Sequence, residues 1–240
     1  HPLQTIRPKI GGVHRFTSQN RLLRPISWFM LRKKRGIMPV GADLSYPFTG
    51  RWLTQNSPAN RVPSHGTTLF ATAYAIDFVP VDDFGRSAPI TVSSLLRPEP
   101  AALFTGFGRP VLAPATGTVV AALDSQPDHP AYRGIPSVGY ALTQRRRVAA
   151  GWAGLAGNHV MIETSGGIVA LCHLQLGSIR VQVGQQVSAG DPVAHCGNSG
   201  NSTEPHLHLQ VIDRLDVEHA VAVPFTLNGA LPRNGEIIDA

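Results

Sequence analysis

Only two of the 240 residues in this sequence are cysteines, and only 15% are charged. One potential pair, Cys172 and Cys196, does not define a disulfide framework, and its spacing is not that of a zinc knuckle. No apolar run approaches the roughly 20 residues of a membrane-spanning helix, so we expect a soluble protein without a transmembrane segment. The sequence begins at His1 without a recognisable signal peptide and therefore indicates no compartment by itself.

The composition is that of a globular chain rich in turns. Hydrophobic residues make up 42%, and 24 glycines and 20 prolines separate many short runs of valine, isoleucine and leucine. Such punctuation favours many short strands. We therefore predict an all-β to β-rich α+β fold, and a chain of this length can bury a substantial core.

Basic residues are concentrated near the N-terminal end. The net charge is +6, and no lysine follows the run Arg32-Lys33-Lys34-Arg35. This segment either attracts a polyanion, such as a cell-wall polymer, a lipid surface or nucleic acid, or is an ordinary solvated segment. We predict a basic N-terminal extension over residues 1–45, a folded domain over 46–225 and a C-terminal tail over 226–240.

Short strands are predicted along the domain. We expect a strand over residues 74–81, two strands around a turn at 115–117, and a hairpin over 158–175. Three more short strands are expected after residue 181. Two long loops are predicted between these strands, at 84–108, where a short helix is the alternative, and at 124–157.

The most informative stretch is NSTEPHLHLQV, residues 201–211. In an extended strand His206 and His208 share one face while Leu207 and Leu209 share the other, which places the two imidazoles about 7 Å apart along the strand. A single H-x-H of this kind is usually only the polar face of an exposed strand. Its meaning therefore depends on which other side chains reach the same face.

Three further residues could converge on that face. Asp77 lies among large apolar residues, where a metal ion would stabilise its carboxylate; a hydrogen-bonded or edge position is the alternative. His65 is the one histidine near Asp77 in the sequence. His173 could join the H-x-H pair, because its neighbours Cys172 and Leu174 are expected to face away from it. A catalytic zinc site needs three such ligands and one open position.

At this point the sequence resembles a known family. The succession of a histidine, an aspartate, the segment CHL and the segment GNSGNSTEPHLH is similar to that of peptidase family M23, the zinc metallopeptidases of the lysostaphin and LytM type. The resemblance covers residues 46–211, its most specific motif is GDPVAHCGNSGNSTEPHLHLQV, and LAPATGTVVAAL matches the family's core hairpin. It implies a small antiparallel β-sheet core with the metal in a groove crossed by loops.

Position by position, the resemblance implies that His65, Asp77 and His208 bind Zn2+ and that His173 and His206 are the two catalytic histidines. The family usually places its first histidine and its aspartate four positions apart, whereas here twelve positions separate His65 from Asp77. The residues between them must therefore loop out and return if both are to reach one ion.

The implied activity is that of a zinc metalloendopeptidase acting on stem peptides or cross-bridges of peptidoglycan, in a secreted or periplasmic location. No nucleic-acid partner is expected, and the sequence indicates no oligomeric state. The alternative is a catalytically silent relative that binds the cell wall or regulates another hydrolase; such proteins typically lack site residues that this chain keeps. A lipoyl- or biotinyl-type carrier, suggested by the rhythm of PVLAPATGTVV, is rejected because it needs a lysine and none follows Lys34.

The remaining histidines match no motif. We expect surface or packing roles for His129, His159, His195 and His219. A further hypothesis is that the N-terminal extension blocks the open position of the metal, with Asn20 as the ligand.

Overall fold

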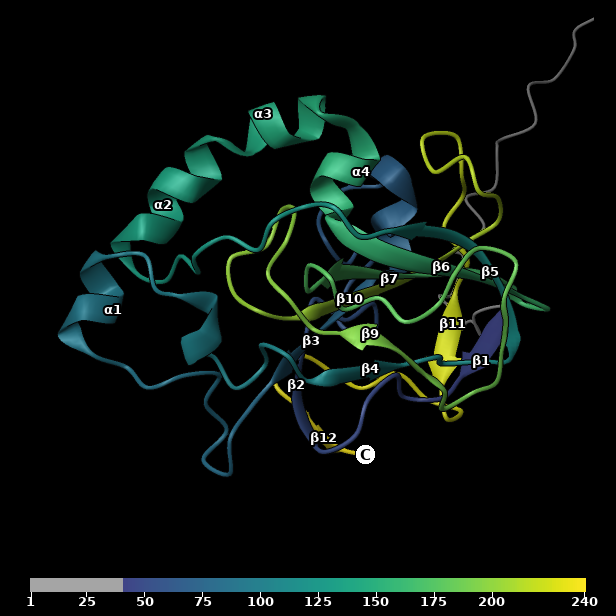
Figure 1. Cartoon of the computed structure of the whole chain (residues 1–240), viewed down its shortest axis with the longest axis horizontal. Coiled ribbons are helices and arrows are strands. Elements are labelled where there is room, and N and C mark those ends of the chain that lie inside the picture. The colour runs from purple at the N-terminus through teal and green to yellow at the C-terminus, as the bar shows by residue number, and fades with distance from the viewer. Residues whose placement is uncertain (1–40) are drawn as a thin grey trace, which may run out of the picture. The chain divides into compact units, whose positions relative to one another are not determined.

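A computed structural model describes residues 41–240 of the chain. Its largest element is an eight-stranded sheet in the order β12-β2-β3-β10-β7-β6-β5-β8, in which all neighbours are antiparallel (Figure 1). The predicted β-rich fold with an antiparallel core is therefore confirmed. In sheet order the strands are β12 (Ile237–Asp239), β2 (Arg51–Gln55), β3 (Ile76–Pro80), β10 (Leu207–Ile212), β7 (Gly167–Leu174), β6 (Asn158–Thr164), β5 (Gly117–Leu123) and β8 (Gln186–Val187).

Two small sheets accompany the large one. β1 (Ala42–Leu44) pairs in parallel with β11 (Phe225–Leu227), and β4 (Pro110–Leu112) pairs antiparallel with β9 (Pro192–His195). Strands β1 and β12 lie outside the predicted domain limits of 46 and 225, yet both are hydrogen-bonded to strands within or across those limits. The predicted extension therefore contributes β1 to the folded unit, and the predicted tail contributes β12 and most of β11.

Strict alternation along the central strands separates a core face from a site face. In β10, Leu207, Leu209 and Val211 belong to the main core, while His208 and Gln210 point to the opposite face. Each fully buried side chain of this size contributes roughly 1.5–3 kcal/mol, so a register shift by one residue would be strongly disfavoured. The core thus fixes which face of the sheet carries the histidines.

The main core packs side chains from all three sheets. At its centre Phe48 stacks on Trp52 with ring centroids 4.4 Å apart, and Phe78 of β3 meets the Phe48 ring edge-on at 4.9 Å. A second cluster on the site face joins Met161, Ala170 and other residues of the sheet to the half-buried Phe70 and Trp152. The site face is therefore covered by packed segments along part of its length.

Helical segments cover part of the site face. The prediction of a long loop over residues 124–157 is wrong. Residues 124–157 are not simply a loop: they contain α2 (Ile135–Leu142), α3 (Gln144–Ala149) and α4 (Gly151–Ala156), which form an arch beside the sheet (Figure 1). The two first helices bury none of their residues, so they lack the apolar periodicity that would have indicated them.

The remaining helical segments are short. They are the 3-10 segment η1 (Leu69–Tyr74), α1 (Val92–Leu96) and the 3-10 segment η2 (Ala101–Leu103). The last two lie within 84–108, where a loop or a short helix is predicted. Among residues 41–240, no helix has both the length and the apolar character required to span a membrane.

Candidate metal centre

Two adjacent strands hold the centre of the site. Asp77 of β3 is paired with His208 of β10 in the sheet register, and both side chains are buried. His208 Nδ1 lies 2.9 Å from Asp77 Oδ1. The backbone ladder thus determines the relative position of two of the residues that the sequence indicates as metal ligands.

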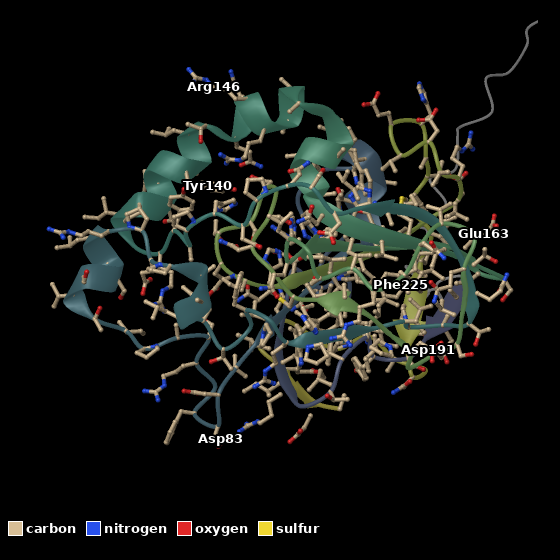
Figure 2. All side chains as sticks on the ribbon, viewed as in Figure 1. Asp83, Tyr140, Arg146, Glu163, Asp191 and Phe225 are labelled. Atoms are coloured by element: carbon tan, nitrogen blue, oxygen red, sulfur yellow. The ribbon has the colours of Figure 1, made fainter. Side chains whose placement is uncertain are left out.

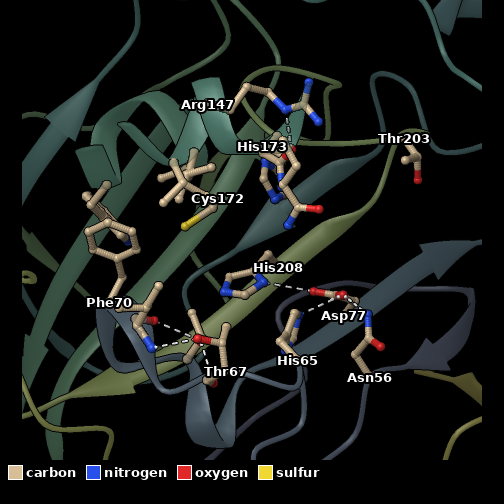
Figure 3. Close-up of a pocket in the computed structure, with 18 of the residues that line it drawn as sticks. Asn56, His65, Thr67, Phe70, Asp77, Arg147, Cys172, His173, Thr203 and His208 are labelled. Carbon is tan, nitrogen blue, oxygen red and sulfur yellow. Dashed lines mark hydrogen bonds and ion pairs between the residues drawn. The ribbon is translucent and has the colours of Figure 1, made fainter. Parts of the chain in front are cut away.

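The third residue arrives from a loop that closes on itself. The amide of Ser64 donates to the carbonyl of Ala73 at 3.0 Å, which brings the two ends of the segment before β3 together. Phe70 and Ala71 at its tip have positive φ angles of 54° and 57°. As a result His65 Nε2 lies 3.0 Å from Asp77 Oδ2, in spite of the twelve positions between them (Figure 3).

These three residues could hold one metal ion. One ligand atom from each of His65, Asp77 and His208 lies within 4.8 Å of the other two. Two imidazole nitrogens and one carboxylate oxygen are a donor set suited to catalytic zinc, with a fourth position open.

Hydrogen bonds on the far side of His65 orient its ring toward the possible metal position. The Ser64 hydroxyl donates to the carbonyl of Thr72 at 3.2 Å, so it accepts from His65 Nδ1 at 3.0 Å. Neutral His65 then carries its proton on Nδ1 and turns the lone pair of Nε2 toward the Asp77 carboxylate. Two lone pairs 3.0 Å apart repel unless a proton or a metal ion lies between them.

His208 is held in the same manner. The side-chain amide of Gln210 donates to the carbonyl of Phe70 at 3.0 Å, which leaves Gln210 Oε1 to accept from His208 Nε2 at 2.9 Å. The lone pair of neutral His208 is thus on Nδ1, again directed at Asp77. Such outer hydrogen bonds fix the tautomer and ring orientation of metal-binding histidines. Both rings fit a shared cation beside the carboxylate.

The charge state of Asp77 is also suited to a cation site. In the metal-free protein a proton takes the place of the cation between the rings and the carboxylate. Burial by itself raises the pKa of Asp77, but the charge on His65 and hydrogen bonds with His208 and His65 in that protonated state outweigh it and hold the pKa well below its usual range. Asn56 donates a further hydrogen bond to Oδ2 at 2.7 Å. The carboxylate therefore stays ionised at neutral pH.

The other two predicted residues lie beside this group. The ring centroids of His173 and His206 are 4.6 Å apart, and those of His173 and His208 are 5.9 Å apart. His206 Nε2 lies 3.9 Å from Asp77 Oδ1. His173 Nδ1 donates to the carbonyl of Ser199 at 2.9 Å, and His206 Nδ1 to that of Glu204 at 2.8 Å. Each neutral ring therefore keeps its lone pair on Nε2.

His173 reaches the site by an irregularity in β7. The register pairs His208 with Cys172, so Cys172 lines the cavity and a regular strand would turn His173 to the opposite face. His173 instead has φ of 63°, and the β6–β7 ladder shifts register between Asn158 and Val160. The expectation that Cys172 faces away from His173 is therefore wrong.

Burial and neighbouring charge make His173 a weak base in the metal-free protein. Its ring is buried, and this burial, together with charge on His206 and His208, holds the pKa of His173 well below its usual range. Neutral imidazole is therefore the dominant form of His173 near pH 7.

The five residues line one cavity of about 340 Å³. One wall is the segment of η1, with Thr67 and Phe70, and the other is the helical arch, with Arg147 and Trp152 (Figure 3). Four polar lining residues that take part in the site or the arch were not singled out from the sequence. They are Asn56 and Gln210, which orient the central group, and Tyr140 and Arg147 from the arch.

The remaining histidines lie outside the cavity lining. His159 is buried against Trp152, His129 bonds the carbonyl of Gly200, His195 contacts Arg180 and His219 contacts Asp216 at the surface. Surface and packing positions are thus confirmed for all four. Both cysteines are buried and unpaired, and Asn20 lies outside the described residues.

Comparison with known proteins matches residues 140–220 to the model of Peptidase family M23. The glycyl-glycine endopeptidase ALE-1 of Staphylococcus capitis is 34% identical over 71 residues, which cover 29% of this chain and 20% of ALE-1. The peptidoglycan DD-endopeptidase ShyA of Vibrio cholerae is 35% identical over 78 residues, which cover 32% of this chain and 18% of ShyA. The chain thus matches about a fifth of the length of these relatives.

Among solved structures, the catalytic domain of lysostaphin from Staphylococcus simulans overlaps 62% of this chain and 74% of its own, with 21% identity and a TM-score of 0.35. The family match includes His173, His206 and His208 but begins at residue 140, after His65 and Asp77. The last two are therefore assigned to the site by geometry and not by that match.

Proposed function

We propose, from the confirmed resemblance to peptidase family M23 over residues 140–220, that this chain is a zinc-dependent endopeptidase that hydrolyses peptide bonds of peptidoglycan. The observation that carries the proposal is the convergence of His65 Nε2 and His208 Nδ1 on the two carboxylate oxygens of Asp77, at 3.0 and 2.9 Å. A divalent cation satisfies all three groups at once. A purely structural cluster would not need both rings held in this tautomer.

In this proposal His65, Asp77 and His208 hold the zinc ion. When bound there, zinc supplies a Lewis acid that polarises a peptide carbonyl and favours ionisation of water. Outer hydrogen bonds from Ser64 and Gln210 keep the two imidazoles oriented toward it.

His173 and His206 are proposed to move the protons. Each anchors its Nδ1 on a backbone carbonyl and presents Nε2 next to the metal group. One neutral ring accepts the proton of the attacking water at Nε2 and later passes it to the leaving amine. The other ring, protonated at Nε2 by solvent, donates a hydrogen bond to the developing oxyanion. The depressed pKa of His173 supports its presence as the neutral base. Such general acid-base help is worth about 10²- to 10⁴-fold in rate.

The substrate is proposed from the relatives. ALE-1 is named as a glycyl-glycine endopeptidase and ShyA as a peptidoglycan DD-endopeptidase, so a cross-bridge or stem peptide of peptidoglycan is the substrate class we assign here. Because peptidoglycan lies outside the cytoplasmic membrane, this proposal implies a secreted or periplasmic location.

Purified peptidoglycan tests the proposal. Zinc-loaded protein should release fragments with new amine termini, identified by mass spectrometry, and a chelator should stop the release until zinc is restored. His206→Ala should retain zinc and lose turnover, because its ring orients no metal-binding group. If the zinc-loaded protein releases nothing from walls of several chemotypes but still binds them, the catalytically silent alternative replaces this proposal.

A further inference from the structure

An unneutralised arginine lies on the wall of the cavity. Arg147 of α3 lines the same cavity as the metal group, and among residues 41–240 no carboxylate forms an ion pair with it (Figure 3). The one acidic residue in the cavity lining is Asp77, whose oxygens contact His65, His208 and Asn56 and not Arg147. Arg147 therefore has no carboxylate partner of its own among the side chains that line the cavity.

The guanidinium of Arg147 is fixed in place. Nε donates to Asn201 Oδ1 at 2.6 Å, Nη1 to Thr143 Oγ1 at 2.7 Å and Nη2 to the carbonyl of Tyr140 at 2.7 Å. The cation also lies over the ring of Tyr140, 3.6 Å from its centroid, and Tyr140 in turn stacks on Tyr132 at 4.6 Å. The Arg147 side chain is thus already ordered, so it would lose little rotamer entropy when it binds a ligand.

These contacts leave donors free. A guanidinium has five N–H groups, and three of them are used, so Nη1 and Nη2 keep one each. Two N–H groups on one planar cation match the two oxygens of a carboxylate. The adjoining wall contains Val148, Trp152 and Leu155, whose apolar surface lowers the local dielectric and strengthens such a pair.

We propose that Arg147 is a specificity-determining residue that binds a free carboxylate of the substrate peptide, on the arch side of the scissile bond. The inference rests on the proposed endopeptidase function and narrows its substrate class. It assigns to this chain a peptide with an acidic residue or a free carboxyl group near the bond that is cleaved, in preference to an uncharged bridge such as oligoglycine.

A competing explanation is that Arg147 only supports the loop that contains Asn201 and Ser199. The two roles differ in one measurable respect, because loop support does not depend on the charge of the substrate. Matched substrates therefore separate them without any variant.

The experiment uses synthetic peptides in which glutamate or glutamine occupies, in turn, each of three positions on both sides of the scissile bond. We expect zinc-loaded wild-type protein to prefer glutamate at one of these positions by about 10- to 100-fold in kcat/KM, as for the loss of a charge-assisted pair. Arg147→Gln should abolish this preference. Arg146→Gln removes the same charge from an exposed side chain outside the cavity on the same helix (Figure 2), and should keep it.

Each result of this experiment either supports or overturns the proposed role of Arg147. Equal cleavage of glutamate and glutamine peptides by the wild type at every position overturns the inference while it leaves the proposed function intact. If Arg147→Gln does not fold, Arg147→Lys, which retains the charge without the planar fork, should show a reduced preference. If the wild type cleaves none of these peptides, calorimetry of their binding to it still tests the inference: a preference for glutamate that Arg147→Gln lacks supports it, and equal binding overturns it.

Discussion

His208 of β10 and Asp77 of β3 are direct partners in the sheet, and their side chains meet with 2.9 Å between Nδ1 and Oδ1. The contact joins residues 131 positions apart in the sequence. The backbone ladder sets the separation of the two residues, and the loops around the cavity affect only the orientation of the ring. A metal ion that binds both is therefore held between two adjacent strands of the central sheet.

Replacement of Asp77 tests the centre directly. Asp77→Asn keeps the shape of the side chain but removes the charge on which both histidines converge, so zinc affinity should fall by more than about 100-fold, beyond the effect usual for outer hydrogen-bond partners. Competition against a chromophoric chelator measures this change. Asp83→Asn, at a carboxylate that is 95% exposed, is the matched control and should bind zinc like the wild type (Figure 2). Equal affinities in the two variants would refute the assignment of Asp77.

Gln210 should matter although it does not reach the ion. Gln210→Leu removes the acceptor that holds the proton on His208 Nε2, so we expect zinc affinity to fall by about 10- to 100-fold. Gln186→Leu makes the same chemical change at an exposed position of β8 and should leave the affinity unaltered. The same chelator competition measures both. An unchanged affinity in Gln210→Leu would show that the hydrogen bond does not orient the ring.

The left-handed backbone at His173 can be separated from its ring. His173→Asn and His173→Val both lose the imidazole, but asparagine tolerates a φ of 63° and a β-branched residue does not. The free energy of unfolding of the metal-free valine variant should be lower by about 1–2 kcal/mol than that of the asparagine variant. Urea denaturation measures the difference. Equal stabilities would indicate that β7 regains a regular conformation without the histidine.

The pH dependence of stability should reveal buried neutral histidine. Burial lowers the pKa of His159 from its ordinary value of 6.5, and the hydrogen bond to Gly157 offsets this only in part. As the pH falls below 6.5 the unfolded chain takes up a proton that the folded protein resists, so the free energy of unfolding should decrease, by about 1.4 kcal/mol for each unit of pKa difference.

His159→Gln removes one such group and should make this decrease shallower, as measured by urea denaturation of metal-free protein between pH 8 and pH 5. His173 contributes in the same direction and accounts for the part that persists. A decrease of the same size in wild type and variant would contradict the buried, neutral state of His159.

Much of the centre could be predicted because alternation in a strand is a strong rule. The H-x-H pattern and the apolar partners Leu207 and Leu209 indicate that His208 of β10 and His206, just before it, lie opposite the core face, and the core contains both leucines. Asp77 between Ile76 and Phe78 follows the same logic in β3. Where both faces of a strand have distinct surroundings, sequence alone determines the side-chain direction.

The parts that could not be predicted depend on local departures from regular structure or on distant contacts. His173 enters the cavity through a positive φ for which a sequence that reads ALCHLQ has no signal, since neither glycine nor asparagine is present. Arg147 lies on a helix without a buried side, and its position over the cavity depends on Asn201, 54 residues away. Gln210 is on the predicted face, yet its role depends on the carbonyl of Phe70.

The hydrogen bond from Gln210 to the carbonyl of Phe70 couples the η1 segment to a residue in the middle of the sheet. That one segment provides His65 and also anchors the amide that steadies His208. Its local unfolding would therefore detach one ligand and loosen another in a single event. Protection of the backbone amides of the η1 segment from hydrogen exchange should consequently rise as zinc binds. The bound ion would thus stabilise the loop that supplies one of its own ligands.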